Sequence, residues 1–185
     1  MRKLMIGLSL AVVACQVSRE PQTAQSKGDI PIGVYAAQTG SEAAFGTSTV
    51  EGEKLAADEI NAAGGVLGRK IKLIIEDDQG KAEEAASVVT KLITSNDVVA
   101  LLGENSSNQS LAAAPIAQTN KVPMVSVSST NPAVTQKGDY IFRVCFTDPY
   151  QGKALAAFVR NNRKLKRAAI LVDRKSDDTR GLAEC

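Results

Sequence analysis

The 185-residue chain contains no histidine. This absence excludes catalytic triads with a histidine base, histidine general acids and histidine metal ligands. The chain also has no P-loop spacing and no nucleophile elbow, the two motifs that would most directly indicate an enzyme on an α/β fold. We therefore expect a protein that is not an enzyme and that holds no cofactor and no metal.

The chain also lacks a long run of charges of one sign. It carries 22 basic and 20 acidic residues. The densest basic stretch, RNNRKLKR at 160–167, is typical of the solvated end of a helix that leads into a strand. We therefore expect no nucleic-acid partner.

The longest apolar run lies at the start of the chain, in MRKLMIGLSLAVVAC. Arg2 and Lys3 precede an apolar segment that is too short to span a bilayer, so residues 1–14 are predicted to be an export signal. The ending Val-Val-Ala-Cys resembles a bacterial lipobox, in which Cys15 would be lipidated. A plain secretory signal with an unrelated cysteine is the alternative. The polar residues 15–29 are predicted to be a flexible tether.

These features predict an exported protein, periplasmic or at the cell surface, anchored by lipid to a bacterial membrane. Removing residues 1–14 takes away two of the 22 basic residues and none of the 20 acidic ones, so the exported part is balanced in charge. Export would permit a disulfide between Cys145 and Cys185, but two cysteines alone do not establish one.

From residue 30 onward, short apolar runs alternate with amphipathic segments. Such alternation predicts an α/β fold, a doubly wound parallel sheet with helices on both faces in three layers. The predicted strands are 30–36, 70–77, 97–103, 122–127, 140–144 and 167–173. The predicted helices are 49–65, ending at Gly64-Gly65, then 81–95, 108–120 and 148–162.

Polar clusters follow four of these strands: QTGSEAAFG, EDDQG, GENSSNQ and SSTNP. In parallel sheets, ligands bind beyond the carboxyl ends of the strands, so the hydroxyls of 106–107 and 128–130 are predicted to face one crevice. Helix capping is the alternative function of such residues, and for Ser106 and Ser129 we expect either capping or a supporting role behind the ligand-contacting residues. Asp77 and Asp78 are interpreted as helix N-caps and not as a catalytic carboxylate pair.

The whole of 30–185 resembles the first half of the bacterial ABC-transporter substrate-binding proteins for branched-chain amino acids, the Leu/Ile/Val-binding family. The segments that carry the resemblance are QTGSEAAFG, GEKLAADEINAAGGVLGRKIKLIIEDDQG, GENSSNQSLAAAPIAQ, VPMVSVSSTNPAVTQ, YIFRVCFTDPYQGKALAAF and, near the end, AAILVD followed by GLAE. The resemblance implies a type I periplasmic binding fold with a first ligand-binding lobe at 30–145 and the start of a second lobe at 146–185.

The same resemblance implies the site. Ser107 and Thr130 match residues that bind the ligand's α-carboxylate through hydroxyl and backbone N–H groups. Ser128 matches a residue whose carbonyl accepts from the α-ammonium, and Phe45 matches an aromatic that covers the ligand; Ser106 and Ser129 are weaker candidates. Independent chemistry agrees, because a buried carboxylate requires several donors and helix N-termini supply them without a net charge.

Two departures from the family pattern bear on the ligand. Asp178 stands where the family has a tyrosine that packs on the ligand side chain, which favours a polar or cationic ligand or weakens the site. The chain ends at Cys185, about halfway along the family's length, which would leave most of the second lobe absent.

The sequence therefore predicts a solute-binding lipoprotein that captures an amino acid, of the branched-chain type or related, and delivers it to the membrane subunits of an ABC permease. The alternatives are a sensory ligand-binding module of the same fold and a non-functional fragment.

Overall fold

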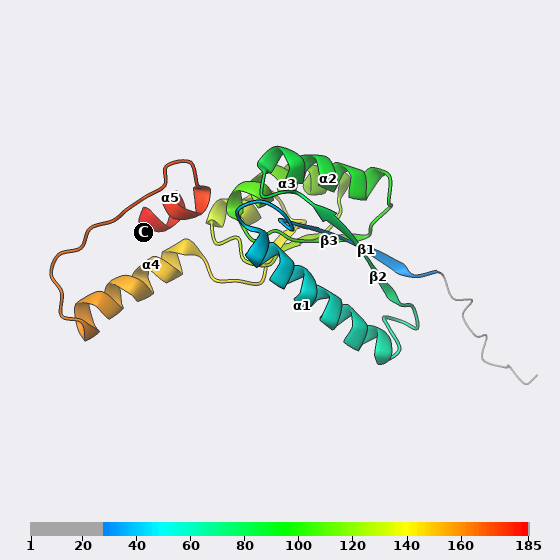
Figure 1. Ribbon diagram of the computed structural model, residues 1–185, viewed down its shortest axis with the longest axis horizontal. Helices are drawn as coiled ribbons and strands as arrows, with labels where there is room; N and C mark the ends of the chain where they lie inside the picture. The colour runs from blue at the N-terminus through cyan, green and yellow to red at the C-terminus, as the bar shows by residue number, and fades with distance from the viewer. Residues whose placement is uncertain (1–27, 185) are drawn as a thin grey trace, which may run out of the picture.

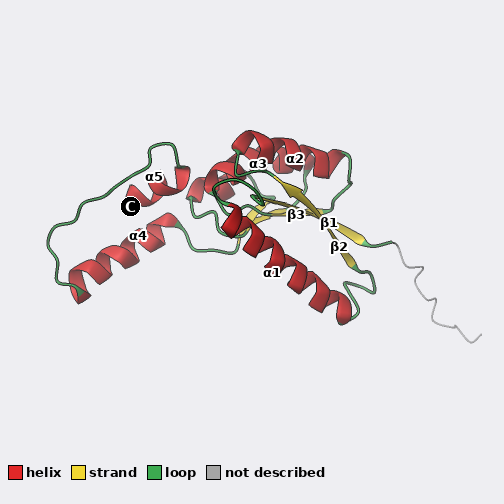
Figure 2. Ribbon diagram, viewed as in Figure 1, coloured by secondary structure: helices red, strands yellow, loops and turns green. Residues whose placement is uncertain are grey.

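The computed structural model describes residues 28–184. Five strands form one sheet in the order β2-β1-β3-β4-β5, and every neighbouring pair is parallel. The strands are β1 (Ile30–Ala36), β2 (Ile71–Asp77), β3 (Ala100–Leu102), β4 (Met124–Ser126) and β5 (Ile141–Arg143). The predicted parallel sheet is confirmed (Figure 2).

Helices cover both faces of the sheet, so the predicted three-layer arrangement is confirmed as well. Helix α1 (Ala43–Ala62) lies on one face, and α2 (Ala82–Thr94) and α3 (Ser107–Asn120) lie together on the other (Figure 1). Such an arrangement allows parallel strands, whose side chains point to both faces, to be buried on both faces.

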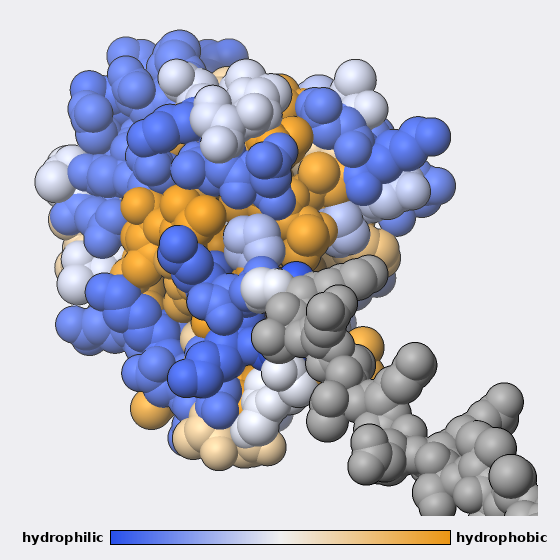
Figure 3. All heavy atoms as spheres, turned by 90° about the vertical axis from the view of Figure 1, so that its right-hand side faces the viewer, coloured by the Kyte–Doolittle hydropathy of each residue, from blue (hydrophilic) through white to orange (hydrophobic). Residues whose placement is uncertain are grey.

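The core follows the two-residue period of the strands. Tyr35 is fully buried on the side of α2 and α3, where its hydroxyl donates to the sulfur of Met124 across 3.3 Å. Its neighbours Val34 and Ala36 pack on the opposite side with Val50 of α1. The core on the α1 side is the smaller of the two. At the surface, the end of the molecule remote from α4 and α5 presents apolar residues among polar ones (Figure 3).

Helix α1 begins six residues before the predicted start at 49 and ends at Ala62, three residues before the predicted end at 65. Gly64 and Gly65 follow it with φ of 106° and 73°. Backbone of this left-handed kind favours glycine and ends the helix. Among the helices of residues 28–184, none combines the length and the apolar character that a membrane crossing requires.

The segments after β5 project away from the sheet and then return to it. Helix α4 (Asp148–Ala157) continues as a π-helical turn, η2 (Phe158–Asn162), and an extended stretch leads back to α5 (Asp177–Ala183), which contacts α3 (Figure 1). The predicted strand at 167–173 is wrong. This stretch pairs with no strand in the described part of the chain, and Ile170 is 71% exposed. An apolar run becomes a strand only where another strand satisfies its backbone groups.

Candidate functional site at the switch point of the sheet

The site lies where the strand order changes direction. From β1 the chain adds β2 on one side of the sheet and β3 on the other, so the loops after β1 and β3 diverge at this point. In open α/β sheets a crevice for ligands forms there. Two contacts tie its walls together: the Ala37 N–H donates to Glu104 Oε1 across 2.9 Å, and Asn105 Nδ2 donates to Thr49 Oγ1 across 2.9 Å.

Ser106 and Ser107 direct hydrogen-bond donors into this crevice from the start of α3. Ser106 Oγ donates to Asp178 Oδ2 across 2.8 Å. The Ser107 N–H donates to both carboxylate oxygens of Asp178, at 3.0 and 3.1 Å, and its hydroxyl donates to Oδ1. Three donor groups from two serines therefore converge on one carboxylate, at the helix end where a negative charge is favoured.

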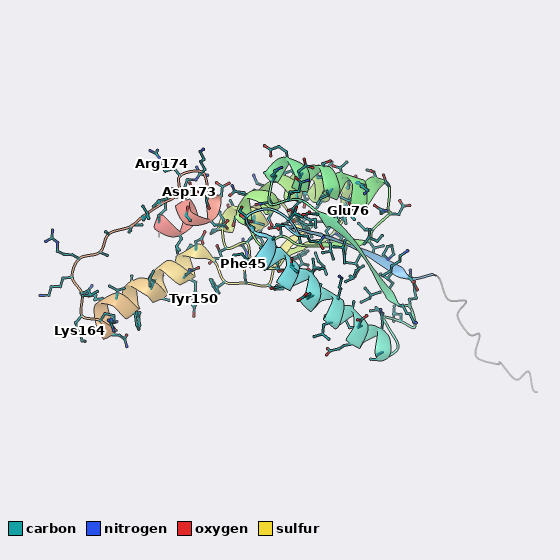
Figure 4. The ribbon with its side chains drawn as sticks, in the orientation of Figure 1. Phe45, Glu76, Tyr150, Lys164, Asp173 and Arg174 are labelled. Carbon is teal, nitrogen blue, oxygen red and sulfur yellow. The ribbon has the colours of Figure 1, made fainter. Side chains whose placement is uncertain are left out.

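A cavity of about 290 Å³ adjoins these donors. Three of the sequence-predicted residues, Phe45, Ser106 and Ser128, line it, and so do three further residues: Glu42, Asn105 and Asp178. Phe45 lies in the first turn of α1, at the helix end that faces α4, and is 68% exposed (Figure 4). Clefts for small ligands start at about 300 Å³, so this cavity is near the lower limit and of a size for one small molecule.

Thr130 is placed beside the cavity and not among the residues that line it. Its carbonyl accepts from the Asp148 N–H across 3.0 Å, and its hydroxyl acts to lower the pKa of the Asp148 carboxyl group, which burial raises. The next residue, Asn131, donates its N–H to Ser107 Oγ across 3.2 Å. The SSTNP loop therefore contacts the α3 donors through Asn131, whereas Thr130 contacts Asp148.

Ser129 belongs to a buried network behind the site. Its side chain is fully buried, donates to the Glu104 carbonyl across 3.0 Å and accepts from Ser110 Oγ across 2.8 Å. Its N–H donates to Ser126 Oγ across 3.1 Å. The expected supporting role of Ser129 agrees with this placement. Ser106 is the N-cap residue of α3, but its side chain makes no capping hydrogen bond, so the expectation of side-chain capping is wrong. Its hydroxyl donates to the Asp178 carboxylate instead.

Arg143, which is not among the residues predicted from the sequence, fixes the conformation of the SSTNP loop at 128–132, called the hydroxyl loop below. Its guanidinium donates to the carbonyls of Ser129, Asn131 and Pro132, at 2.8, 2.9 and 3.2 Å, and to Thr135 Oγ1 at 2.8 Å. A planar fork of donors suits such a set of acceptors, whereas a lysine could satisfy fewer of them. The only sequence signal was a lone arginine in an otherwise apolar strand.

Carboxyl groups dominate the electrostatics around the crevice. Burial raises the pKa of Glu104 to about 7 even though two backbone N–H groups donate to it, and burial raises the pKa of Asp78 to about 6. Burial, and then the nearby Asp178 charge, raise the pKa of Glu42. Burial also raises the pKa of Asp148, and the Thr130 side chain opposes this shift. Among residues 28–184, no group of three or more histidine, cysteine or acidic side chains is arranged to hold a metal ion.

The N-cap interpretation of Asp77 and Asp78 is wrong. Lys81 is the N-cap residue of α2. Asp77 instead accepts from the Gln38, Thr39 and Gln79 N–H groups, at 2.9, 3.2 and 2.9 Å, and so shapes the loop after β1. Burial opposes ionisation of Asp77, but these bonds and one from the Thr39 hydroxyl outweigh it and lower its pKa. Asp78 is fully buried and accepts from the Gly80 N–H across 2.9 Å.

Several sequence predictions fall on residues that the structure does not describe. The export signal at 1–14, all of the tether at 15–29 except its last two residues, the lipidation site Cys15 and Cys185 lie outside 28–184. Cys145 is described and carries a free thiol, 3.5 Å from the Ser129 carbonyl.

Comparison with known proteins agrees with this architecture. The sequence pattern of the periplasmic binding protein family matches residues 29–184. An amino acid binding protein of Pseudomonas aeruginosa is 34% identical over 157 residues, and so is a Leu/Ile/Val-binding protein of Rhizobium johnstonii. Each of these alignments covers 84% of this chain and 42% of the relative, so the chain spans about two fifths of the length of these relatives.

Solved structures give the same result. A leucine binding protein of Thermotoga maritima superposes with a TM-score of 0.79 at 40% identity, covering 84% of this chain and 43% of that one. A branched-chain amino acid transporter substrate-binding protein of Streptococcus pneumoniae, in complex with isoleucine, superposes with a TM-score of 0.81 at 38% identity, covering 84% and 45%. The chain belongs to the periplasmic binding protein family.

Proposed function

We propose that this protein captures a free amino acid, of the branched-chain type or a close analogue, in the crevice at the switch point of the sheet. The observation that carries the proposal is the convergence of the Ser107 N–H, the Ser107 hydroxyl and the Ser106 hydroxyl on a single carboxylate. A donor set that holds one carboxylate has the chemistry to hold another, such as the α-carboxylate of an amino acid.

The remaining roles follow from the layout of the cavity. Phe45 and Ser128 line it together with Glu42. We propose that Phe45 covers the ligand side chain and that the Ser128 carbonyl accepts a hydrogen bond from the α-ammonium. The Glu42 carboxyl group, on the same wall, offers that ammonium an opposite charge. Thr130 is proposed as a further carboxylate donor, which requires its hydroxyl to leave Asp148 when the ligand binds.

The wider context of the proposal comes from the relatives, whose names describe amino acid binding and branched-chain amino acid transport. We propose that the chain works outside the cytoplasm and passes its ligand to an ABC permease. Residues 30–145 and 146–185 are proposed as a first lobe and the beginning of a second. Lipid attachment at Cys15 is tested by mass spectrometry of the membrane-associated protein, in which Cys15→Ser should abolish a lipid-modified N-terminal peptide.

Thermal unfolding of the purified protein against a panel of the free amino acids tests the binding function. Anything that binds only the folded state raises the melting temperature by mass action. We expect a rise with one or a few amino acids that is absent with the corresponding amines, because these lack the carboxylate.

The decisive variant is Ser107→Ala, which removes a charge-assisted donor worth about 1.5–3 kcal/mol and should weaken binding roughly tenfold or more. Ser48→Ala is the matched control, because Ser48 is an exposed serine on α1 whose hydroxyl bonds only the Ala44 carbonyl. A cooperative melt that no amino acid moves would refute the proposed function.

A further inference from the structure

The carboxylate of Asp178 makes the contacts that an incoming ligand carboxylate would need. Oδ1 accepts from the Ser107 N–H and hydroxyl, and Oδ2 accepts from the Ser106 hydroxyl and, at 3.1 Å, from the same N–H. Ser107 is fully buried. All three donor groups of the α3 terminus are therefore in use by a residue of the same chain, 71 positions further along the sequence.

Asp178 is held in this place by backbone contacts as well as by its own side chain. Asn108 accepts from the Asp177 N–H across 2.7 Å and donates to the Lys175 carbonyl across 3.2 Å. Asn131 Nδ2 donates to the Asp177 carbonyl across 3.1 Å. One asparagine from α3 and one from the hydroxyl loop thus fix the segment that presents the Asp178 carboxylate to the donors.

Two carboxylates cannot share this donor set. The donors are already saturated, and two like charges about 4 Å apart repel each other strongly near a protein surface. Glu42 and Asp148 add negative charge on the neighbouring walls, and the guanidinium of Arg143, a nearby cation, is engaged with loop carbonyls. An anionic ligand group therefore reaches Ser106 and Ser107 only if Asp178 leaves.

We propose that Asp178 is an internal competitor of the ligand: its carboxylate occupies the serine donors of α3 in the free protein, and a ligand carboxylate binds by displacing it. The inference rests on the proposed function in so far as the natural ligand is an amino acid. As a consequence, Asp178 lowers the apparent affinity of the site for its ligand, since a ligand binds only the fraction of molecules in which the donors are free.

Whether the Asp178 carboxylate occupies the serine donors can be measured directly at the Ser107 amide. First-turn N–H groups of a helix have no partner within the helix, so the Ser107 N–H depends on Asp178 for its acceptor. We expect this amide to exchange with solvent deuterium roughly tenfold faster or more in Asp178→Ala than in the wild type. Asp177→Ala is the matched control, because the Asp177 side chain pairs with Arg180 and not with the serines. Equal exchange in wild type and Asp178→Ala would overturn the proposal.

Competition is measured with sodium acetate, the simplest carboxylate probe, against sodium chloride at equal ionic strength. Acetate should shift the Ser107 amide resonance of Asp178→Ala at a concentration roughly tenfold lower or less than it needs in the wild type. Asn108→Ala leaves the donors intact but frees the segment, so it should move acetate binding in the same direction. Acetate that binds both proteins equally, or neither, would overturn the proposal.

L-Leucine and L-isoleucine form the second arm, which separates this inference from the proposed function. Tighter binding to Asp178→Ala than to the wild type supports both. Weaker binding to Asp178→Ala would show that Asp178 is a ligand contact and would overturn the competitor role alone. If acetate behaves as expected while no amino acid binds either protein, the competitor role stands and the proposed function fails.

Discussion

The backbone N–H of Ala37 donates to Oε1 of Glu104 across 2.9 Å and ties the end of β1 to the end of β3. The Glu104 carbonyl in turn accepts from the hydroxyls of Ser126 and Ser129, at 3.1 and 3.0 Å, which belong to β4 and to the loop after it. One buried glutamate thus sets the spacing of three strand ends, and these strand ends border the ligand crevice. Changes that disturb this junction should affect both stability and binding.

Gly46 provides a test of that junction. A Cβ at this position of α1 would overlap the Ala37 carbonyl, whereas a Cβ at Gly52 of the same helix would meet nothing within 4 Å. We expect Gly46→Ala to lower the free energy of unfolding by roughly 1–3 kcal/mol through overpacking. Gly52→Ala should raise it by up to about 1 kcal/mol through helix propensity. Urea unfolding measures both, and equal effects of the two substitutions would refute the close approach of α1 to Ala37.

Arg143→Lys should loosen the hydroxyl loop. The guanidinium serves three carbonyls and one hydroxyl, and an ammonium on the same stem leaves some of these acceptors unpaired. We expect a loss of roughly 1–3 kcal/mol in unfolding free energy, the cost of unpaired buried acceptors, together with weaker amino acid binding. Arg160→Lys, on the exposed end of the α4 segment, is the control and should change neither quantity. Wild-type stability in Arg143→Lys would contradict this role.

Thr130 distinguishes a hydroxyl that serves the ligand from one that only satisfies Asp148. Thr130→Val keeps the shape and removes the hydroxyl, while Thr130→Ser restores it. If the hydroxyl contacts the ligand carboxylate, Thr130→Val weakens binding of the preferred amino acid roughly tenfold and Thr130→Ser restores most of it. Isothermal titration calorimetry measures the affinities. Unchanged affinity in the valine variant would assign Thr130 to Asp148 alone.

The contribution of Glu53 to the free energy of unfolding should fall as the pH rises from about 4.5 to about 7. Burial raises the pKa of Glu53 to about 7, and both of its side-chain oxygens are buried without a hydrogen-bond partner. Because this pKa lies above the ordinary value, the folded protein binds the proton more tightly than the unfolded chain. Its contribution to stability is present at low pH and is lost between about pH 4.5 and 7. Glu104 acts in the same direction.

Glu53→Gln should therefore stabilise the protein at pH 8, by the order of 1 kcal/mol once partial exposure is allowed for, and change little at pH 5. Glu51→Gln, an exposed neighbour on the same helix, is the control and should show no such pH-dependent gain. Thermal unfolding at the two pH values gives the comparison. A Glu53→Gln variant with the same stability profile as the wild type would contradict the burial of this charge.

The fold was largely predictable because its signals are local. Alternation of apolar strands with amphipathic helices, and Gly64-Gly65 after α1, act within a few residues and survive in the tertiary structure. The error at 167–173 has a physical cause, since strand pairing depends on a partner and no sequence window contains one. Arg143 and Glu104 were missed for a related reason: each acts on backbone groups of distant segments, which composition and spacing do not report.

The sequence by itself determined the parallel sheet, the positions of the polar loops at its carboxyl edge and the two serines at the start of α3. These follow from residue periodicity and from the fixed direction of parallel strands. Only the tertiary structure decided what those serines hold. Asp178 reaches Ser107 because α4 and the extended stretch after it bring α5 back to α3, and the partner of a buried donor is set by distance in space, not along the chain.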